Sequence, residues 1–404
     1  MKIMMLSYMD YLGAGSASKK IFSMLRKEDV DVDLFVKKKN SGLSKKIELS
    51  KVDSIKSLMF DLFNYGSNKF LNNNYSRKFN PYHKSLGWFS SPYPKIINSS
   101  NYDIVQLNWI NNFLSIRDIV EIKKPIIWRF SDMWPILGIS HYEYKNMNYN
   151  LYSIIEDYNY KRKQILRDKK LNIITPSNWM KTKIENKSSN NNWKISTIYT
   201  PVDQDIFKPL DINEIKKIKK QYEINSNQKV LCFCADNINE KRKGLERIID
   251  VFKNNLISGQ EFTLFTIGKG KTKFNKYNNL NIKNLGFINS QAEVNKIYNI
   301  SDLLLLFSDI DNLPQVGIEA QSSGLPVLTF NHSGLSEIIE NYITGIYVED
   351  TLASISSKIE NFFKDTAKIS MYKSASRERS LKIWSNKVIF KKYLNLYSSI
   401  LSEK

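Results

Sequence analysis

Short, mostly apolar runs recur along both halves of the chain, with helix-like stretches between them. They occupy residues 2–8, 103–110, 124–130 and 171–177 in the first half, and residues 229–236, 261–268, 279–287, 302–308 and 325–330 in the second. Runs of this length suit parallel strands buried on both faces, and their alternation with helices is typical of doubly wound α/β domains. The pattern therefore predicts two Rossmann-like domains.

The chain has 404 residues, which is too long for one ordinary core. Residues 195–211, ISTIYTPVDQDIFKPLD, combine two prolines with several turn formers and predict an interdomain linker. We therefore expect a first domain over residues 1–200 and a second over 201–384. Residues 385–404 have helical spacing and predict a terminal helix that packs back on the first domain, and the polar stretch 40–100 predicts an insertion of helices and loops.

The net charge is +20, and most of it lies in the first half. Residues 1–200 contain 32 basic and 17 acidic residues, whereas residues 201–404 contain 28 basic and 23 acidic residues. Such a field attracts phosphates, whether in nucleic acid, anionic lipid head groups or a polyprenyl diphosphate carrier. No basic stripe interleaved with aromatic residues and no RNA-binding signature is present, so nucleic acid is not expected as a partner. Peripheral contact with an anionic membrane stays open.

Cys232 and Cys234 alternate on an apolar run, which predicts core packing, and cysteines this sparse suit a reducing compartment. The N-terminal residues MKIMMLSYMDYLG resemble a first strand more than a signal peptide. No apolar stretch reaches the 18 or so residues of a membrane span. These features predict a cytoplasmic protein, or one that lies peripherally on the inner face of the plasma membrane.

Residues 308–339, SDIDNLPQVGIEAQSSGLPVLTFNHSGLSEII, carry the most informative motif. An apolar strand ends here, Asp311 is positioned to cap a helix, and Pro314 suits its first turn. The helix start would offer backbone N–H groups and a positive dipole end to a diphosphate, and Glu319 could accept hydrogen bonds from vicinal sugar hydroxyls. Ligands of open α/β sheets bind at this carboxyl edge.

Here the sequence resembles the family 4 glycosyltransferases, which are retaining enzymes of the GT-B fold, and within them the exopolysaccharide and lipopolysaccharide branch. The family signature of two acids eight positions apart, a small-residue turn and a later Glu is matched by Asp311, Glu319, SSGLPV and Glu337, although the first acid is Asp rather than Glu. Further segments match the family in order: residues 200–209, 240–249, 265–270 and 285–288. The resemblance covers most of the chain except residues 40–100.

The resemblance implies two Rossmann-like domains that face each other across a cleft, with a UDP- or GDP-sugar on the second domain and no further cofactor. Lys243 and Arg242 would bind the donor diphosphate, Glu319 the ribose, and Asp311 would lie near the donor sugar. The expected donor-binding residues are Gly13, Gly15, Arg242, Lys243, Gly268, Phe287, Asp311, Asn312, Leu313, Pro314 and Glu319. Gly13 and Gly15 follow the first strand, where backbone must approach a ligand closely.

In the first domain, residues 128–142, WRFSDMWPILGISHY, resemble the family's acceptor-side motif. Asp132, Trp134 and His141 match it and are the expected acceptor-binding residues, whereas many relatives have a His where this chain has Ser131. Asp132, Lys243 and Asp311 are the expected catalytic residues. The acceptor would be a saccharide or a polyprenyl-diphosphate-linked saccharide.

The function implied is a retaining hexosyltransferase of surface polysaccharide biosynthesis. Two alternatives stay open: a catalytically silent sugar-nucleotide-binding subunit that supports a partner transferase, and a nucleotide-sugar epimerase of the same fold. Asp309 and Asp311 form an Asp-x-Asp pair, a metal motif in another sugar-transferase fold, but a strand end and helix cap explain the pair better. The family neutralises the leaving diphosphate with cations and helix dipoles, so no metal is expected.

Overall fold

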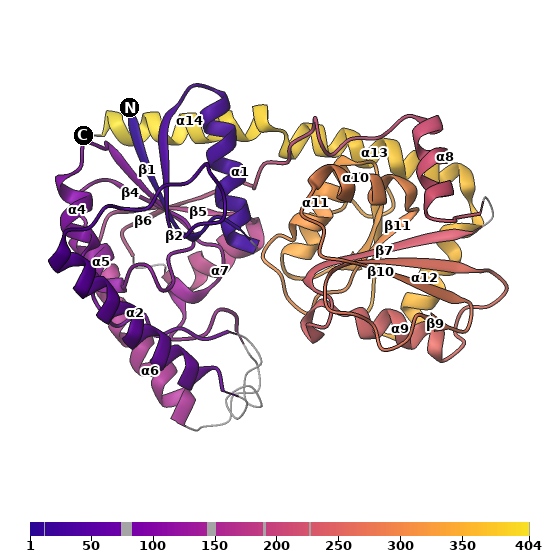
Figure 1. Ribbon diagram of the computed structural model, residues 1–404, viewed down its shortest axis with the longest axis horizontal. Helices are drawn as coiled ribbons and strands as arrows, with labels where there is room; N and C mark the ends of the chain where they lie inside the picture. Colours follow the sequence, from indigo (N-terminus) through magenta and orange to yellow (C-terminus); the bar gives the residue numbers. More distant parts are fainter. Residues whose placement is uncertain (12, 74–82, 144–150, 189–190, 226–227, 404) are drawn as a thin grey trace. The chain divides into compact units, whose positions relative to one another are not determined.

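The computed structural model describes residues 1–11, 13–73, 83–143, 151–188, 191–225 and 228–403, and the chain divides into two units (Figure 1). Unit 1 comprises Met1–Tyr199 together with Phe390–Lys404, and unit 2 comprises Thr200–Ile389. The chain thus leaves unit 1 once and returns to it near its end.

Unit 1 contains a parallel sheet whose described strands run in the order β2-β1-β3-β4-β5-β6. The strands are β1 (Lys2–Met9), β2 (Asp31–Lys38), β3 (Ile104–Leu107), β4 (Ile126–Arg129), β5 (Leu171–Thr175) and β6 (Trp193–Thr197). The helices are α1 (Gly13–Lys27), α2 (Lys51–Leu71), α4 (Tyr93–Ser99), α5 (Ile116–Glu121), α6 (Leu151–Lys163) and α7 (Asn178–Ser188), with 3-10 turns η1 (Trp134–Ile136) and η2 (Gln164–Leu166).

Unit 2 contains a sheet whose described strands run in the order β13-β12-β11-β7-β8-β10-β9, all parallel except the edge pair β9 and β10. The strands are β7 (Lys229–Asn237), β8 (Phe262–Lys269), β9 (Lys276–Tyr277), β10 (Leu280–Gly286), β11 (Leu303–Leu306), β12 (Val327–Phe330) and β13 (Gly345–Val348). The helices are α8 (Ile212–Gln221), α9 (Leu245–Lys253), α10 (Gln291–Ile300), α11 (Gln315–Ser322), α12 (Leu352–Lys364) and α13 (Thr366–Trp384), with 3-10 turns η3 (Lys241–Lys243) and η4 (Ser333–Glu337).

Each sheet reverses its direction of growth once. In unit 1 the chain moves from β1 to β2 on one side and then to β3 on the other, and in unit 2 it moves from β7 toward β10 and then to β11 on the opposite side of β7. Since crossovers between parallel strands are right-handed, such a reversal places successive helices on opposite faces of the sheet. Both units are therefore doubly wound, as the apolar runs predict.

The central strands are buried on both faces, which is why their sequences are continuous apolar runs. All four residues of β3, β4 and β11 are buried, and the register of the β1–β3 pair places Leu6 beside Leu107. Parallel strands that are covered by helices on both faces have no solvent-exposed face, so their sequences do not alternate between apolar and polar residues.

Helix α14 (Asn386–Ser402) belongs to unit 1 from Phe390 onward (Figure 1). The hydroxyl of Tyr397 on α14 donates to Oε1 of Gln106 on β3 at 2.5 Å, and both residues are fully buried. Glu403 at the end of the helix forms ion pairs with Lys170 and Lys194.

One boundary differs from the sequence prediction. Residues 195–197, the start of the predicted linker, belong to β6, which pairs with β5 along its whole length. The register places Ile195 beside Ile173, and this pairing cannot be detected locally because its partner strand lies some twenty residues earlier. In the described part of the chain, no helix is both long and apolar enough to cross a membrane.

Candidate functional site

The candidate donor site lies in unit 2, where β7 and β11 are neighbours and the sheet reverses its direction of growth. The loop after β7 contains η3 and ends at Gly244, and the loop after β11 runs to α11. Because both loops leave the carboxyl edge at the switch point, they border the crevice in which open α/β sheets bind ligands.

These two loops meet in an ion pair. Nζ of Lys243 lies 2.6 Å from Oδ2 of Asp311, and Nη1 of Arg242 lies 3.6 Å from the same oxygen. Arg242 also donates through Nη1 to the Ile310 carbonyl at 2.7 Å and through Nε to Glu240 at 2.9 Å. Three of the residues predicted for the donor site, Lys243, Arg242 and Asp311, are therefore in contact.

The carboxylate of Asp311 is ionised in this setting. Burial acts to raise the pKa of Asp311, but the positive charges of Lys243 and Arg242 and the hydrogen bond from Lys243 outweigh it, so the pKa lies below its ordinary value. Side chains of Lys243 and Asp311 are 18% and 15% exposed, which leaves the pair accessible from solvent.

The backbone of the loop that carries Asp311 packs directly against the backbone of η4. The amide of Gly334 donates to the Asp311 carbonyl at 2.9 Å, and a Cβ atom at Gly334 would lie only 1.4 Å from the Asn312 carbonyl oxygen. The other loop is packed in the same way, because a Cβ at Gly244, which has φ +81°, would lie 2.2 Å from the Phe307 carbonyl oxygen. Glycine is therefore required at both positions.

The predicted helix cap at Asp311 is wrong. Helix α11 begins at Gln315, and its N-cap residue is Pro314, which is extended and makes no side-chain cap hydrogen bond. The carboxylate of Asp311 is instead engaged by Lys243, which a sequence pattern does not reveal because the lysine lies on another loop. Asn312, Leu313 and Pro314 are buried between the ion pair and the helix.

Glu319 lies on α11 and is half-buried. Burial and then the negative charge of Glu319 raise the pKa of Cys234 on β7 to about 12. Burial likewise raises the pKa of Cys232, so both thiols stay protonated at neutral pH. Both cysteines are free, and Cys232 is fully buried in the core.

Asp309 of the Asp-x-Asp pair is engaged by a residue that the sequence analysis did not single out. Arg247 on α9 binds Oδ1 of Asp309 at 2.7 Å and Oδ1 of Asp350 at 2.6 Å. Asp309 and Asp311 thus each face a cation on a different element. Over the described ranges, no group of three or more His, Cys, Asp or Glu side chains is arranged to hold a metal ion.

Gly268 lies near the end of β8, and Phe287 directly follows β10. Gly268 has φ +141°, and a Cβ there would lie 1.9 Å from the Ala235 carbonyl oxygen, so this glycine permits β8 to pack against the end of β7. Phe287 follows β10 and is 45% exposed, with Nζ of Lys269 located 5.7 Å from its ring centre. An exposed ring beside a cation offers a stacking surface for a base.

Gly13 and Gly15 begin helix α1 in unit 1. Gly13 is exposed with φ +30°, whereas Gly15 is buried and a Cβ there would lie 2.7 Å from the Met9 carbonyl oxygen. The absence of a side chain at Gly15 lets α1 pack on the end of β1, so helix packing accounts for this glycine. Gly13 is the one of the two that faces solvent.

The acceptor-side residues of unit 1 form a buried network. Nδ1 of His141 lies 2.6 Å from Oδ2 of Asp132, and its Nε2 lies 3.1 Å from the Ser85 hydroxyl and 3.2 Å from Nδ2 of Asn111. The ring of His83, an exposed residue, is centred 5.0 Å from that of His141. Ser85, Asn111 and His83 come from distant segments, so the sequence pattern gave no sign of them.

The prediction that Trp134 binds the acceptor is wrong for this structure. The side chain is fully buried, Nε1 donates to the Ser85 carbonyl at 2.8 Å, and Nζ of Lys163 lies 3.8 Å from the ring centre. Lys163 also donates to the carbonyls of Trp134 and Gly138. With both faces of its ring surrounded by protein, Trp134 stabilises the 128–142 loop rather than stacking on a sugar.

Replacement of Asp132 by asparagine is expected to destabilise unit 1 by about 2 kcal/mol at pH 7. Burial acts to raise the pKa of Asp132, but the charge and hydrogen bond of His141 and the Trp134 amide outweigh it, so the folded-state pKa is below the ordinary 3.8. A lowered carboxyl pKa contributes stability that is present above the unfolded-state value and is lost as pH falls through the folded-state value.

Urea unfolding at a series of pH values measures this difference. The difference in free energy of unfolding between Asp132→Asn and the native protein should be largest above about pH 4 and should become smaller below it. The matched control is Asp157→Asn, at an exposed acid on α6, for which no such gap is expected. A constant gap across the acid range would refute the role of the ionised carboxylate.

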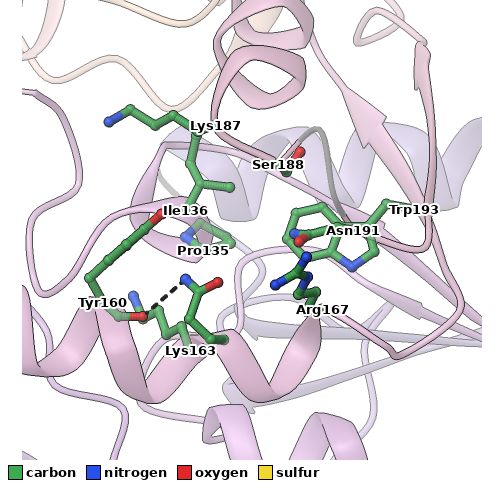
Figure 2. A pocket seen from close by; sticks show the side chains of 10 residues that line it. Pro135, Ile136, Tyr160, Lys163, Arg167, Lys187, Ser188, Asn191 and Trp193 are labelled. Atoms are coloured by element: carbon green, nitrogen blue, oxygen red, sulfur yellow. Dashed lines mark hydrogen bonds between the residues drawn. The ribbon is translucent and has the colours of Figure 1, made fainter.

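A small pocket in unit 1 shares Lys163 with the surroundings of Trp134 (Figure 2). It measures about 20 Å³, which is room for one water molecule. Its lining includes the basic side chains of Lys163, Arg167 and Lys187 together with Trp193. A pocket of this size does not accommodate a sugar or a nucleotide, so it is not the acceptor site.

Two doubly wound α/β units in one chain make this a protein of the GT-B fold, which solved glycosyltransferases share over nearly the whole chain. HepE of Anabaena, solved in complex with UDP-glucose, superposes with a TM-score of 0.65 at 15% identity, covering 99% of this chain and 100% of that one. At such identity the likeness establishes the fold.

Residues 214–379, all in unit 2, match the model of the family described as Glycosyl transferases group 1. The chain is 24% identical over 218 residues to N-acetyl-alpha-D-glucosaminyl L-malate synthase of Bacillus anthracis, covering 52% of this chain and 55% of that one. It is 31% identical over 156 residues to the O-antigen biosynthesis glycosyltransferase WbnH of Escherichia coli, covering 36% and 41%. The chain thus spans about half the length of the curated relatives it matches.

Proposed function

We propose that this chain is a glycosyltransferase that moves a sugar from a nucleotide sugar to a saccharide or lipid-linked acceptor in surface polysaccharide biosynthesis. The observation that carries the proposal is the contact of Lys243 and Arg242 with Asp311 at the switch point of unit 2. This contact lies within the residues that match the glycosyltransferase family model.

The donor diphosphate would bind at this edge, with Lys243 and Arg242 as its cations and the N-terminus of α11 supplying a positive dipole end. Asp311 positions the side chains of Lys243 and Arg242 through its ion pairs with them, and it would lie beside the donor sugar. Glu319 would accept hydrogen bonds from the ribose hydroxyls. Complexes of a similar structure with UDP-glucose support a uridine donor, and a GDP-sugar is the other candidate.

The transfer we propose retains the configuration at the anomeric carbon. The bond from that carbon to the diphosphate oxygen breaks and its electron pair leaves with the diphosphate, while the acceptor hydroxyl oxygen forms the new bond on the same face. The acceptor proton passes to the departing phosphate oxygen. Lys243 and Arg242 stabilise the charge that develops on the diphosphate, which is the main catalytic contribution expected of them.

The first test is a thermal-shift and turnover screen of the whole chain against a panel of UDP- and GDP-sugars. We expect one donor to stabilise the protein, and Glu319→Ala to weaken its apparent affinity about 10- to 100-fold, since hydrogen bonds between a carboxylate and hydroxyls are lost. The matched control is Glu378→Ala, at an exposed glutamate on α13. Stabilisation without hydrolysis or transfer would favour the silent binding subunit, and no response to any donor would contradict the donor site itself.

A further inference from the structure

Ser333 has a backbone conformation that is unusual for a buried residue with a side chain. Seven described residues other than glycine have a positive φ, namely Asp29, Asn112, Glu223, Asn255, Asn278, Ser333 and Tyr342. Six of them are exposed or half-buried, whereas Ser333, with φ +50°, is only 8% exposed. Left-handed backbone costs free energy for a residue with a Cβ atom, and such strain is concentrated at functional sites. The turn alone does not explain a serine here, because glycine would adopt it without strain.

The strained turn holds the backbone of Asp311 through two hydrogen bonds. The Asp311 amide donates to Oγ of Ser333 at 3.4 Å, and the Asp311 carbonyl accepts from the Gly334 amide at 2.9 Å. Two successive residues thus satisfy both backbone groups of Asp311. His332 is extended, with φ −149° and ψ 167°, and Ser333 begins η4. The change of direction at Ser333 therefore brings its own side chain and the next amide to the same residue.

The hydroxyl of Ser333 has a second partner. Nδ1 of His332 lies 3.3 Å from Oγ of Ser333. Since this oxygen already accepts from the Asp311 amide, its proton is left to donate to Nδ1, which requires a neutral ring protonated on Nε2. Desolvation lowers the pKa of His332 below its ordinary value and outweighs the negative charges of Asp350 and Asp309, which act to raise it. The ring is therefore neutral at pH 7 and can accept.

The ring of His332 is itself held in place by the core of unit 2. It stacks on Phe330, the last residue of β12, with the ring centres 5.3 Å apart and the planes at 28°. Phe330 is fully buried, and the guanidinium of Arg247 on α9 lies 5.5 Å from the centre of its ring. The partner that orients the Ser333 hydroxyl is thus fixed by a buried strand and a helix.

We propose that Ser333 is a positioning residue of the donor site, whose hydroxyl fixes the backbone of Asp311 so that its carboxylate meets Lys243. The inference rests on the proposed function, because that ion pair defines the donor site. Oδ2 of Asp311 lies 2.6 Å from Nζ of Lys243, and a rotation of the Asp311 backbone would move this oxygen. Stabilisation of a developing charge depends on preorganised groups at fixed distances, so a small displacement lowers the rate.

The variants Ser333→Ala and Ser333→Gly separate the hydroxyl from the strain. Both remove the hydrogen bond to Asp311, but alanine keeps a Cβ atom in the left-handed region and glycine does not. The melting temperature of Ser333→Gly should therefore lie about 2–4 °C above that of Ser333→Ala. Both should lower kcat about tenfold with KM for the donor little changed. If Ser333 only stabilised the fold, activity would follow stability, and the glycine variant would be the more active one.

Hydrogen–deuterium exchange of the full chain without donor measures the positioning directly. The exchange rate of the Asp311 amide should rise at least about tenfold in both Ser333 variants, because the amide loses its acceptor. The matched control is the pair Glu223→Ala and Glu223→Gly, since Glu223 has φ +54° and an 88% exposed side chain after α8 in the same unit. This pair should show the same order of melting temperatures, with native kinetics and native exchange at Asp311.

The outcomes distinguish the positioning role from the transfer reaction. Native exchange at Asp311 in both Ser333 variants would overturn the inference, and so would a native kcat in either of them. Faster exchange in both variants, with no response of the native protein to any nucleotide sugar, would support the positioning of Asp311 by Ser333 and contradict the proposed function instead.

Discussion

Replacement of Lys243 by alanine is expected to lower kcat/KM for turnover of the preferred nucleotide sugar about 100- to 1,000-fold. Lys243 lies 2.6 Å from Asp311 at the carboxyl edge of β7 and β11, where the leaving diphosphate would gain negative charge. Removing one preorganised cation from such a site costs about 2.7–4 kcal/mol of transition-state stabilisation. Initial-rate kinetics with purified protein measure the loss.

Two controls accompany this measurement. Lys253→Ala removes an exposed lysine from the end of α9 and should leave the kinetics unchanged. Lys243→Ala also leaves Asp311 with Arg242 at 3.6 Å as its remaining cation, so a melting curve must show that unit 2 is still folded. A folded Lys243→Ala protein with native kinetics would exclude Lys243 from the donor site.

The second large effect concerns stability. Gly334→Ala should destabilise unit 2 by about 3 kcal/mol or more, because its Cβ would lie 1.4 Å from the backbone carbonyl oxygen of Asn312 and the two loops would have to separate. For a unit of this size the melting temperature should fall by roughly 6–12 °C. Separation also breaks the hydrogen bond from Gly334 to Asp311, so donor-induced stabilisation should weaken as well.

Gly42→Ala is the matched control, since a Cβ at Gly42 meets nothing within 4 Å. We expect its melting temperature to stay within about a degree of the native value, as for most exposed substitutions. Differential scanning calorimetry resolves the two variants directly. A Gly334→Ala protein as stable as Gly42→Ala would mean that the loops after β11 and β12 are not held as the structure describes.

Much of the fold could be predicted because buried parallel strands carry an unambiguous pattern. The apolar runs at residues 103–110, 124–130 and 302–308 contain β3, β4 and β11, each buried along its whole length. The loops that follow such strands gather at one edge of the sheet. The family resemblance implied that Lys243 and Asp311, on two of these loops, belong to one donor site. Their 2.6 Å contact agrees with that prediction.

What the sequence could not supply are contacts between distant loops. Asp311 looks like a helix cap when only its neighbours are considered, and Lys243 becomes its partner only after folding. Trp134 looks like a sugar-stacking residue until Lys163, on a helix nearly thirty residues later, is found over its ring. The exposure of apolar side chains on α2, such as Ile55 and Leu62, could not be predicted either, since periodicity gives the width of an apolar stripe but not the direction it faces.

The return of the chain to unit 1 has a consequence for synthesis. Helix α14, with Tyr397 bonded to Gln106 in the interior of unit 1, leaves the ribosome only after all of unit 2. Unit 2 spans roughly 190 residues, which take about 10–40 s to translate. During that interval the surface of unit 1 around Gln106 is not covered by α14. The unit that is made first is therefore completed only by residues that are made after unit 2.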